Sequence, residues 1–193
     1  MLNKLNLGSG SRPFKDHVNV DVLDRYNPDI CWDLNTTPYT WAADNHFEFI
    51  AAYHILEHLD PDPKKYLSII SELYRISKPG ATWHIMIPHH ASDDFINDPT
   101  HTRAITAEQF FLFDQVHNLK CINKNAANST LGLDLNIDLE ITQATNHMNK
   151  RITNFGFSEK DLEVFKLFGR NICTRVEIFI TIHKPCRVSN ANA

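Results

Sequence analysis

The chain has 193 residues, 42% of them hydrophobic, which is enough for one domain with a substantial core. Its formal net charge of −4 gives no basic surface of the kind that binds a phosphate backbone, so nucleic acid is not an expected partner. No apolar run approaches the length of a membrane span, and the opening residues MLNKLNLGSG lack the features of a secretory signal, so we expect a cytoplasmic protein without a membrane partner.

The four cysteines are scattered, without any C-x-x-C pair, which argues against a zinc knuckle and against a disulfide framework. We therefore expect reduced thiols and a fold that depends on one hydrophobic core.

The chain length predicts a single domain over residues 1–187, followed by a short flexible tail, VSNANA, over residues 188–193.

Short apolar segments in the first third of the chain predict strands at residues 4–10, 17–22, 28–34 and 46–53. The last of these is almost wholly apolar, as expected for a strand that is buried on both faces. The connection between the first two is unusually short, because residues 9–17 leave room for at most one helical turn.

Helical spacing of apolar residues predicts a helix over residues 63–78, which Pro79 and Gly80 should end, and residues 81–88 then form a fifth strand. Helix is also expected over residues 106–115, after a capping Thr106. Alternating apolar residues at 131–142 and 174–184 predict two late strands that pair antiparallel at one edge. The fold class is therefore α/β, with a Rossmann-like, doubly wound, mostly parallel sheet and an antiparallel C-terminal edge hairpin.

The segment AYHILEHLDP, residues 51–60, contains His54, Glu57 and His58 in the order H-x-x-E-H. On one long helix these residues share a face, so that two imidazoles can hold zinc while the carboxylate activates water. The alternative is that the same residues follow the fourth strand and belong to the core or to a ligand pocket.

The glycine turn LNLGSG ends the first predicted strand, where open α/β sheets bind ligands. Asp21 closes the second strand, where a carboxylate can accept hydrogen bonds from two ribose hydroxyls, and Asp33 with Leu34 closes the third. A nucleoside laid across these strand ends would meet all of them. The alternative is that both aspartates are only turn formers or caps.

The segments LNLGSG, VNVD, CWDL, AAYHILEHL, LYRISKPG and DPTHTR together resemble the class I S-adenosylmethionine-dependent methyltransferases, in particular small members in which LNLGSG is quickly followed by VNVD. The resemblance runs from Lys4 to about Gln109. It implies S-adenosyl-L-methionine as cofactor. It also implies cofactor-binding roles for Asn6, Gly8, Ser9 and Gly10 near the methionine part, Asp21 at the ribose, Asp33 and Leu34 at the adenine, and Tyr53 and His54 beside the sulfonium.

Two departures from the family pattern are visible. Asn6 stands where many relatives carry an acid, and Arg12 occupies the position of a third glycine. An uncharged amide at Asn6 can still position the backbone, but with weaker attraction for the cofactor's amine.

In the methyltransferase interpretation, His54 follows a buried strand and starts a short helix that Pro61 stops, whereas a zinc protease needs a longer helix. Glu57 and His58 then line the pocket or begin the helix. No metal is expected at H-x-x-E-H.

The segment after the fifth strand, residues 89–106, is polar, and its apolar residues show neither helical nor strand periodicity. It is therefore a candidate lid over the acceptor, or alternatively an ordinary surface loop. It carries three candidate catalytic histidines, His89, His90 and His101, of which His101 is the preferred general base. The alternatives are a divalent metal held by these histidines with Asp93, Asp94 or Asp98, and purely structural roles. Arg103 is a candidate for binding a substrate carboxylate or phosphate.

The sequence thus predicts an enzyme, a methyltransferase that uses S-adenosyl-L-methionine and acts on a small molecule or glycan precursor. The alternative is a non-catalytic cofactor-binding or scaffold protein of the same fold, and a zinc metalloprotease is a distant third. Neither the acceptor nor the oligomeric state follows from the sequence.

Overall fold

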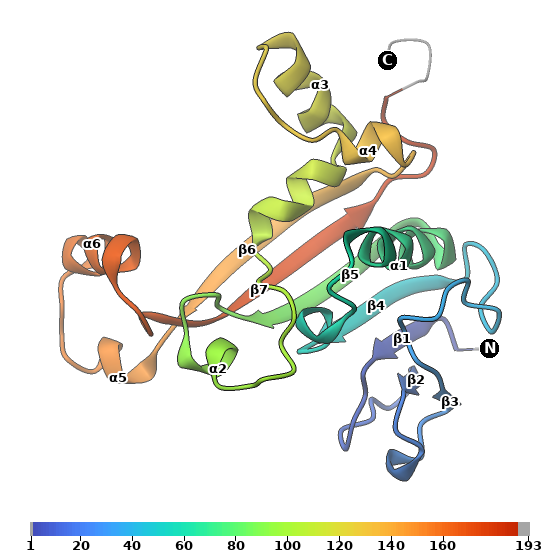
Figure 1. Cartoon of the computed structure of the whole chain (residues 1–193), viewed down its shortest axis with the longest axis horizontal. Coiled ribbons are helices and arrows are strands. Elements are labelled where there is room, and N and C mark those ends of the chain that lie inside the picture. The colour runs from blue at the N-terminus through green and yellow to red at the C-terminus, as the bar shows by residue number, and fades with distance from the viewer. Residues whose placement is uncertain (1, 189–193) are drawn as a thin grey trace.

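The computed structural model describes residues 2–188, without the side chains of residues 166–168. Its centre is a seven-stranded sheet with the strand order β3-β2-β1-β4-β5-β7-β6 (Figure 1). The strands are β1 (Lys4–Leu7), β2 (Val18–Asp21), β3 (Ile30–Cys31), β4 (Phe47–Tyr53), β5 (Ser77–Pro88), β6 (Leu139–Met148) and β7 (Cys173–Ile182). The α-helices are α1 (Pro63–Ile76), α2 (Asp93–Ile96), α3 (Gln115–Asn123), α4 (Leu131–Asp134), α5 (Lys150–Thr153) and α6 (Glu159–Phe168). The 3₁₀ helices are η1 (Asp24–Tyr26), η2 (Leu56–His58) and η3 (Ala107–Phe113).

Strand directions confirm the predicted fold class. β1 pairs in parallel with β2 and with β4, and β4 pairs in parallel with β5. β7 runs antiparallel to both β5 and β6, so the C-terminal strands form the expected antiparallel edge. Residues 8–17, all of which the structure describes, contain no helix. The connection between the parallel strands β1 and β2 therefore consists of turns and irregular chain. The tail expected over residues 188–193 lies, except for Val188, outside the described residues.

The helix α1 forms because Asp62 caps it, accepting a hydrogen bond from the backbone N of Lys64, and because Pro63 occupies its first turn. Its apolar face packs on the sheet, where inward-facing residues alternate along the strands. Ile50, Trp83 and Ile178 belong to this core and are each at most 2% exposed. Burying one such side chain stabilises the fold by about 1.5–3 kcal/mol.

The opposite face of the sheet carries an aromatic and polar layer. The ring of His84 contacts those of Phe49 and Tyr53 edge to face and stacks on Phe179 at 4.1 Å between centroids. Nε2 of His84 lies 2.7 Å from a carboxylate oxygen of Glu177. These half-buried side chains cover the backbone of the central strands.

Several predicted boundaries differ from the structure. The strand predicted over residues 28–34 is only Ile30–Cys31, and the helix predicted over residues 106–115 is the 3₁₀ helix η3. The helix predicted to end at residue 78 ends at Ile76, and Pro79 and Gly80 lie inside β5, which begins at Ser77. Helix ends there because Ser77 takes an extended backbone and donates its hydroxyl to the carbonyl of Leu73, 2.7 Å away. Pairing of Ser77 with Phe47 then extends the strand through the predicted break.

The strand predicted over residues 131–142 is displaced toward the C-terminus, because α4 occupies residues 131–134 and β6 begins at Leu139. Gly132 is packed so closely that an added Cβ would lie 2.8 Å from the carbonyl oxygen of Phe113. Its own carbonyl accepts a hydrogen bond from the side chain of Gln115, at 2.9 Å. Tertiary contacts therefore hold this segment as a turn despite its alternating pattern.

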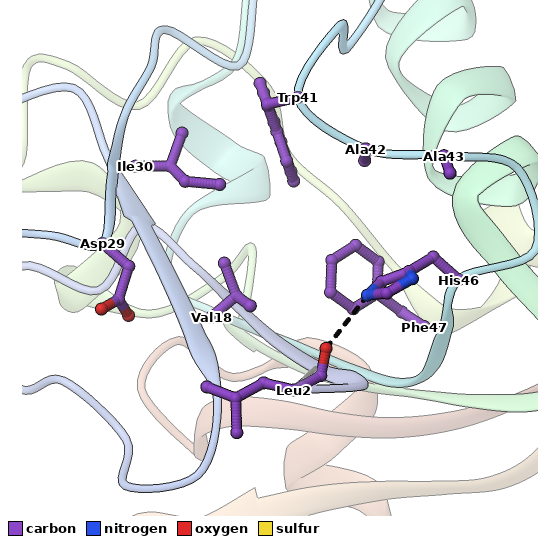
Figure 2. A pocket seen from close by; sticks show the side chains of 9 residues that line it. All are labelled: Leu2, Val18, Asp29, Ile30, Trp41, Ala42, Ala43, His46 and Phe47. Carbon is purple, nitrogen blue, oxygen red and sulfur yellow. Dashed lines mark hydrogen bonds between the residues drawn. The ribbon is translucent and has the colours of Figure 1, made fainter.

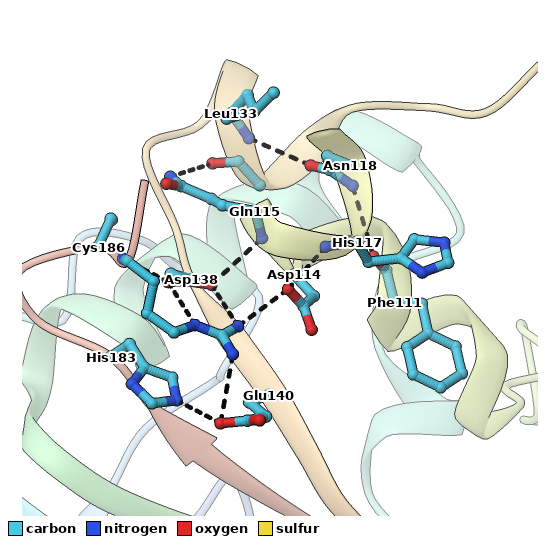
Figure 3. Close-up of polar contacts among 12 residues, drawn as sticks. Phe111, Asp114, Gln115, His117, Asn118, Leu133, Asp138, Glu140, His183 and Cys186 are labelled. Carbon is cyan, nitrogen blue, oxygen red and sulfur yellow. Dashed lines mark hydrogen bonds and ion pairs between the residues drawn. The ribbon is translucent and has the colours of Figure 1, made fainter. Parts of the chain in front are cut away.

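Asp138, which is fully buried before β6, organises the C-terminal edge (Figure 3). Its carboxylate accepts from the backbone N of Gln115 and from the backbone and guanidinium of Arg187. Arg187 also contacts Asp114, the cap of α3, at 2.9 Å. Burial raises the pKa of Asp138, but the hydrogen bonds from Arg187 and Gln115 together with the charge of Arg187 outweigh this, so the pKa of Asp138 lies below its usual range.

Candidate functional site

A cavity of about 130 Å³ lies at the carboxyl ends of β1, β2 and β3, where parallel sheets of this kind bind ligands. Four of the residues expected to bind the cofactor line it, namely Gly8, Asp21, Asp33 and Leu34. The remaining lining residues are Val22, Trp32, Asn35, Ile55, His58 and Leu59. The cavity is smaller than the roughly 300–1,000 Å³ of typical ligand pockets, so a bound cofactor would be only partly enclosed.

The glycine turn after β1 depends on left-handed backbone conformations, with φ of 61° at Gly8 and 48° at Gly10. A Cβ at Gly8 would lie 2.7 Å from Cδ1 of Ile55, so the turn packs directly on the segment after β4. A Cβ at Gly10 would meet no atom within 4 Å. The open space beside Gly10 lets a ligand approach the backbone.

Asp21 holds the glycine turn in place. Its Oδ2 accepts from the backbone N of Gly10 at 2.7 Å, and its Oδ1 accepts from the backbone N of Leu23 at 2.9 Å. An ionised carboxylate has about four acceptor positions, so about two remain for hydroxyl groups of a ligand. The residues present therefore fit the ribose of a nucleoside.

The other predicted cofactor residues do not line this cavity. Asn6 is buried and donates its amide to Asn19, at 3.0 Å. Ser9 is also buried, and its backbone N donates to the carbonyl of Val20. Tyr53 is directed into the aromatic layer, with its hydroxyl hydrogen-bonded to Nδ1 of His84. His54 has a 52% exposed side chain, 3.5 Å from Glu57.

Trp32, Ile55 and Leu59 also line the pocket, although none of them is among the cofactor residues predicted from the sequence. Trp32 immediately precedes Asp33 in the segment CWDL. A place for Trp32 beside the expected adenine could therefore have been predicted from the sequence. His58, expected to line the pocket or begin the short helix, lines the cavity but is the last residue of the 3₁₀ turn η2, which Leu56 begins. The short helix expected before Pro61 is confirmed as this turn.

A second, polar cavity of about 310 Å³ lies where the chain leaves β5. His89 and His90 line it, with their rings stacked at 4.4 Å between centroids. The other lining residues are Thr106, Ala107, Glu108, Ala144, Asn146 and Val176. Since His89 and His90 follow β5, this cavity and the first share the carboxyl edge of the sheet.

The two histidines differ in their hydrogen bonds. Nδ1 of His89 accepts from the backbone N of Ala91, at 3.2 Å, so the neutral ring carries its proton on Nε2. Burial, and secondarily the charge of His90, lowers the pKa of His89, which keeps this ring neutral at pH 7. His90 is exposed, and within the described part of the chain neither of its ring nitrogens has a hydrogen-bond partner, so both are available to a bound molecule.

His101 does not line the cavity of His89 and His90. Its ring is 8% exposed, packs on His58 at 4.5 Å between centroids, and stacks on Phe95 at 5.2 Å. Asp93, considered as a metal ligand with these histidines, instead pairs with Arg170 at 2.6 Å. The predicted grouping of the three histidines therefore does not describe a single cluster.

The segment predicted as a lid, residues 89–106, is docked on the segment that follows β4. Thr102 donates its backbone N to the carbonyl of Glu57, at 2.9 Å. Arg103 donates to the carbonyl of Pro61 at 3.0 Å, and its guanidinium lies over the ring of Tyr66. Arg103, considered for substrate binding, thus anchors the loop.

A third cavity, of about 410 Å³, lies at the opposite end of the sheet (Figure 2). Trp41, Phe47 and His46 line it, together with Val18 and Ile30, the first residues of β2 and β3. It is therefore remote in the fold from the glycine turn. No described helix is long and apolar enough to cross a lipid bilayer.

No protein-family model matches the chain, and no curated protein matches it either. Solved structures do match. A SAM-dependent methyltransferase from Archaeoglobus fulgidus has a TM-score of 0.57 at 16% identity, with 92% of this chain and 85% of that chain covered. A SAM-dependent methyltransferase from Methanosarcina mazei has a TM-score of 0.52 at 14% identity, with 93% and 92% covered.

A third match is Burkholderia thailandensis 1,6-didemethyltoxoflavin-N1-methyltransferase, solved with 1,6-didemethyltoxoflavin and S-adenosylhomocysteine. Its TM-score is 0.51 at 9% identity, with 94% of this chain and 71% of that chain covered. The chain therefore has the Rossmann-like fold of SAM-dependent methyltransferases, and the resemblance seen in the sequence is confirmed at the level of the fold.

Proposed function

We propose that this protein is a SAM-dependent methyltransferase that acts on a small molecule or glycan precursor. The observation that carries the proposal is the cavity at the carboxyl ends of β1 to β3, where Asp21 has acceptor positions free beside the glycine turn. When bound, S-adenosyl-L-methionine supplies an electrophilic methyl group. Asp21 would hold its ribose hydroxyls, Asp33 and Leu34 would border its adenine, and Gly8 to Gly10 would approach its methionine part.

The acceptor is assigned to the polar cavity beside His89 and His90, whose size suits a small molecule rather than a macromolecule. His90 would take the proton from an acceptor hydroxyl or amine, because its ring nitrogens are free. His89, with a proton on Nε2, would donate a hydrogen bond that orients the acceptor. This assignment moves the general base from His101 to His90.

Methyl transfer itself is the test of this function. We expect protein incubated with methyl-labelled S-adenosyl-L-methionine to label a member of a panel of small hydroxyl, amine and sugar acceptors. A matched panel of peptides and nucleic acids should stay unlabelled. Labelling confined to a macromolecule would contradict the proposed substrate class.

The alternative is a non-catalytic cofactor-binding protein, which the position of Asn6 favours. The amide of Asn6 is bonded to Asn19 in the interior and does not face the cavity. In that case S-adenosylhomocysteine would bind, but no acceptor in any panel would be methylated.

We further propose that residues 1–187 act as one domain and that the protein works in the cytoplasm. Support for the compartment comes from the four cysteines, none of which forms a disulfide bond in the described part of the chain.

The variant Asp21→Ala is expected to weaken binding of S-adenosylhomocysteine at least about tenfold. Each hydrogen bond to a charged carboxylate contributes about 1.5–3 kcal/mol, and 1.4 kcal/mol corresponds to a factor of ten. Equilibrium binding measured on folded protein checks this. The control is Asp24→Ala, which removes an exposed carboxylate from the next turn and should leave the affinity unchanged. Equal affinity of both variants would show that Asp21 does not hold the ribose.

A further inference from the structure

Glu57 has a buried carboxylate that lacks hydrogen-bond partners in the described chain. Its side chain is 1% exposed, and neither carboxylate oxygen has a hydrogen-bond partner among the described residues. The nearest basic atom is Nδ1 of His54, 3.5 Å from Oε1 and on a largely exposed ring. A buried carboxylate without donors is costly, and a cation bound to it would offset that cost.

Two imidazoles face this carboxylate. Glu57, His58 and His101 each offer a candidate ligand atom, and these atoms all lie within 4.8 Å of one another. The residues come from two separate segments, since His101 belongs to the loop after β5, whereas Glu57 and His58 follow β4.

Hydrogen bonds determine which ring nitrogens are free. Nδ1 of His101 lies 2.7 Å from the carbonyl oxygen of Phe95, which can only accept, so this nitrogen carries the proton. Thr100 donates its hydroxyl to Asp98 at 2.6 Å and must therefore accept from Nδ1 of His58, at 2.9 Å. In their neutral forms both rings are left with the lone pair on Nε2.

The cluster therefore contains acceptors and no donor. Asp98 does not change this, because its Oδ2 is also an acceptor and lies 3.9 Å from Nε2 of His101. Donation of Nδ1 to a carbonyl or a hydroxyl is the usual support of a metal-binding histidine, since it fixes the ring and the tautomer.

We propose that Glu57, His58 and His101 bind a divalent transition-metal ion. Two imidazole nitrogens and one carboxylate oxygen suit zinc, with water in the fourth position. The ligand atoms would have to close from 4.8 Å to about 3.4 Å, the spacing that zinc bonds of about 2.0–2.1 Å require. The ion would join the loop after β5 to the segment after β4, beside the cofactor cavity that His58 lines. This reverses the expectation that the H-x-x-E-H segment binds no metal, with a ligand set that omits His54.

The test is zinc binding to the full chain after chelation and dialysis, by calorimetry and by elemental analysis of the gel-filtered protein. We expect about one equivalent per chain, and a higher melting temperature with zinc than without it. His58→Ala, His101→Ala and Glu57→Gln should each weaken binding by about 100-fold or more, since loss of even an outer partner costs 10–100-fold.

Two control variants define the ligand set. His90→Ala removes an exposed histidine of the same loop and should retain zinc. His54→Ala should also retain it, whereas its loss would indicate the H-x-x-E-H ligand set instead. Absence of stoichiometric zinc from the folded wild-type chain, or full retention of zinc in folded His101→Ala, would overturn the proposal. None of these results depends on methyl transfer.

Discussion

Asp138→Ala is expected to lower the free energy of unfolding by about 3 kcal/mol. Removing one partner of a buried ion pair costs about 3–5 kcal/mol, because the other charge stays buried and unpaired. The lower end applies here, since the side chain of Arg187 is 24% exposed and still reaches Asp114 and Glu140. Denaturant unfolding at pH 7 measures the change. Asp94→Ala, which removes an exposed carboxylate on α2, should change the stability by less than about 0.5 kcal/mol.

The effect should also depend on pH. The pKa of Asp138 is lowered in the folded state, so its contribution is complete above the unfolded value of about 3.9 and is lost as the pH falls through the lower folded value. The stability difference between the wild type and Asp138→Ala should therefore be constant from pH 7 to about pH 5 and shrink below about pH 4. A stability difference between the two proteins that increases below about pH 4 would contradict a stabilising ion pair between Asp138 and Arg187.

His90→Ala is expected to lower turnover by about 100-fold or more, because a positioned general base contributes about 100-fold to 10,000-fold. Affinity for S-adenosylhomocysteine should stay the same, since His90 lines the acceptor cavity and not the nucleotide cavity. Turnover is measured with the acceptor found in the labelling panel and expressed per folded molecule.

Two further variants make the His90 result specific. His46→Ala removes a histidine at the opposite end of the sheet and should leave turnover unchanged. His101→Ala tests the base expected from the sequence. If His90→Ala keeps turnover, the assignment to His90 is wrong; a simultaneous loss in His101→Ala then assigns the role to His101, and zinc analysis of that variant separates a lost base from a lost metal ligand.

The positions of most strands follow from sequence patterns because apolar runs, glycines and prolines act locally. β1, β2 and β4 were predictable from short apolar runs that end in glycine or polar residues, and β7 from strict alternation. The alternating apolar residues at 131–138 predicted a strand that is not there, and the reason is physical. Close packing of Gly132 on Phe113 overrides the local preference, and no property of residues 131–138 alone encodes that contact.

The nucleotide cavity was predictable in part because the carboxyl ends of neighbouring parallel strands must meet. Asp21 ends β2, and Gly8 and Asp33 follow the ends of β1 and β3, so their proximity follows from topology. The contact between His58 and His101 was not predictable, since it depends on the path of the loop after β5, which has no period. The hydrogen bond from Thr102 to the carbonyl of Glu57 depends on the same loop path.

A calorimetric titration of the wild-type chain with S-adenosylhomocysteine is the direct test of the nucleotide site. The cavity beside Asp21 and the glycine turn predicts saturable binding of one molecule per chain, with competition by S-adenosyl-L-methionine. Folded protein that gives no binding heat at several temperatures, and no change in melting temperature at high ligand concentration, would contradict a nucleotide site and with it the proposed methyltransferase function.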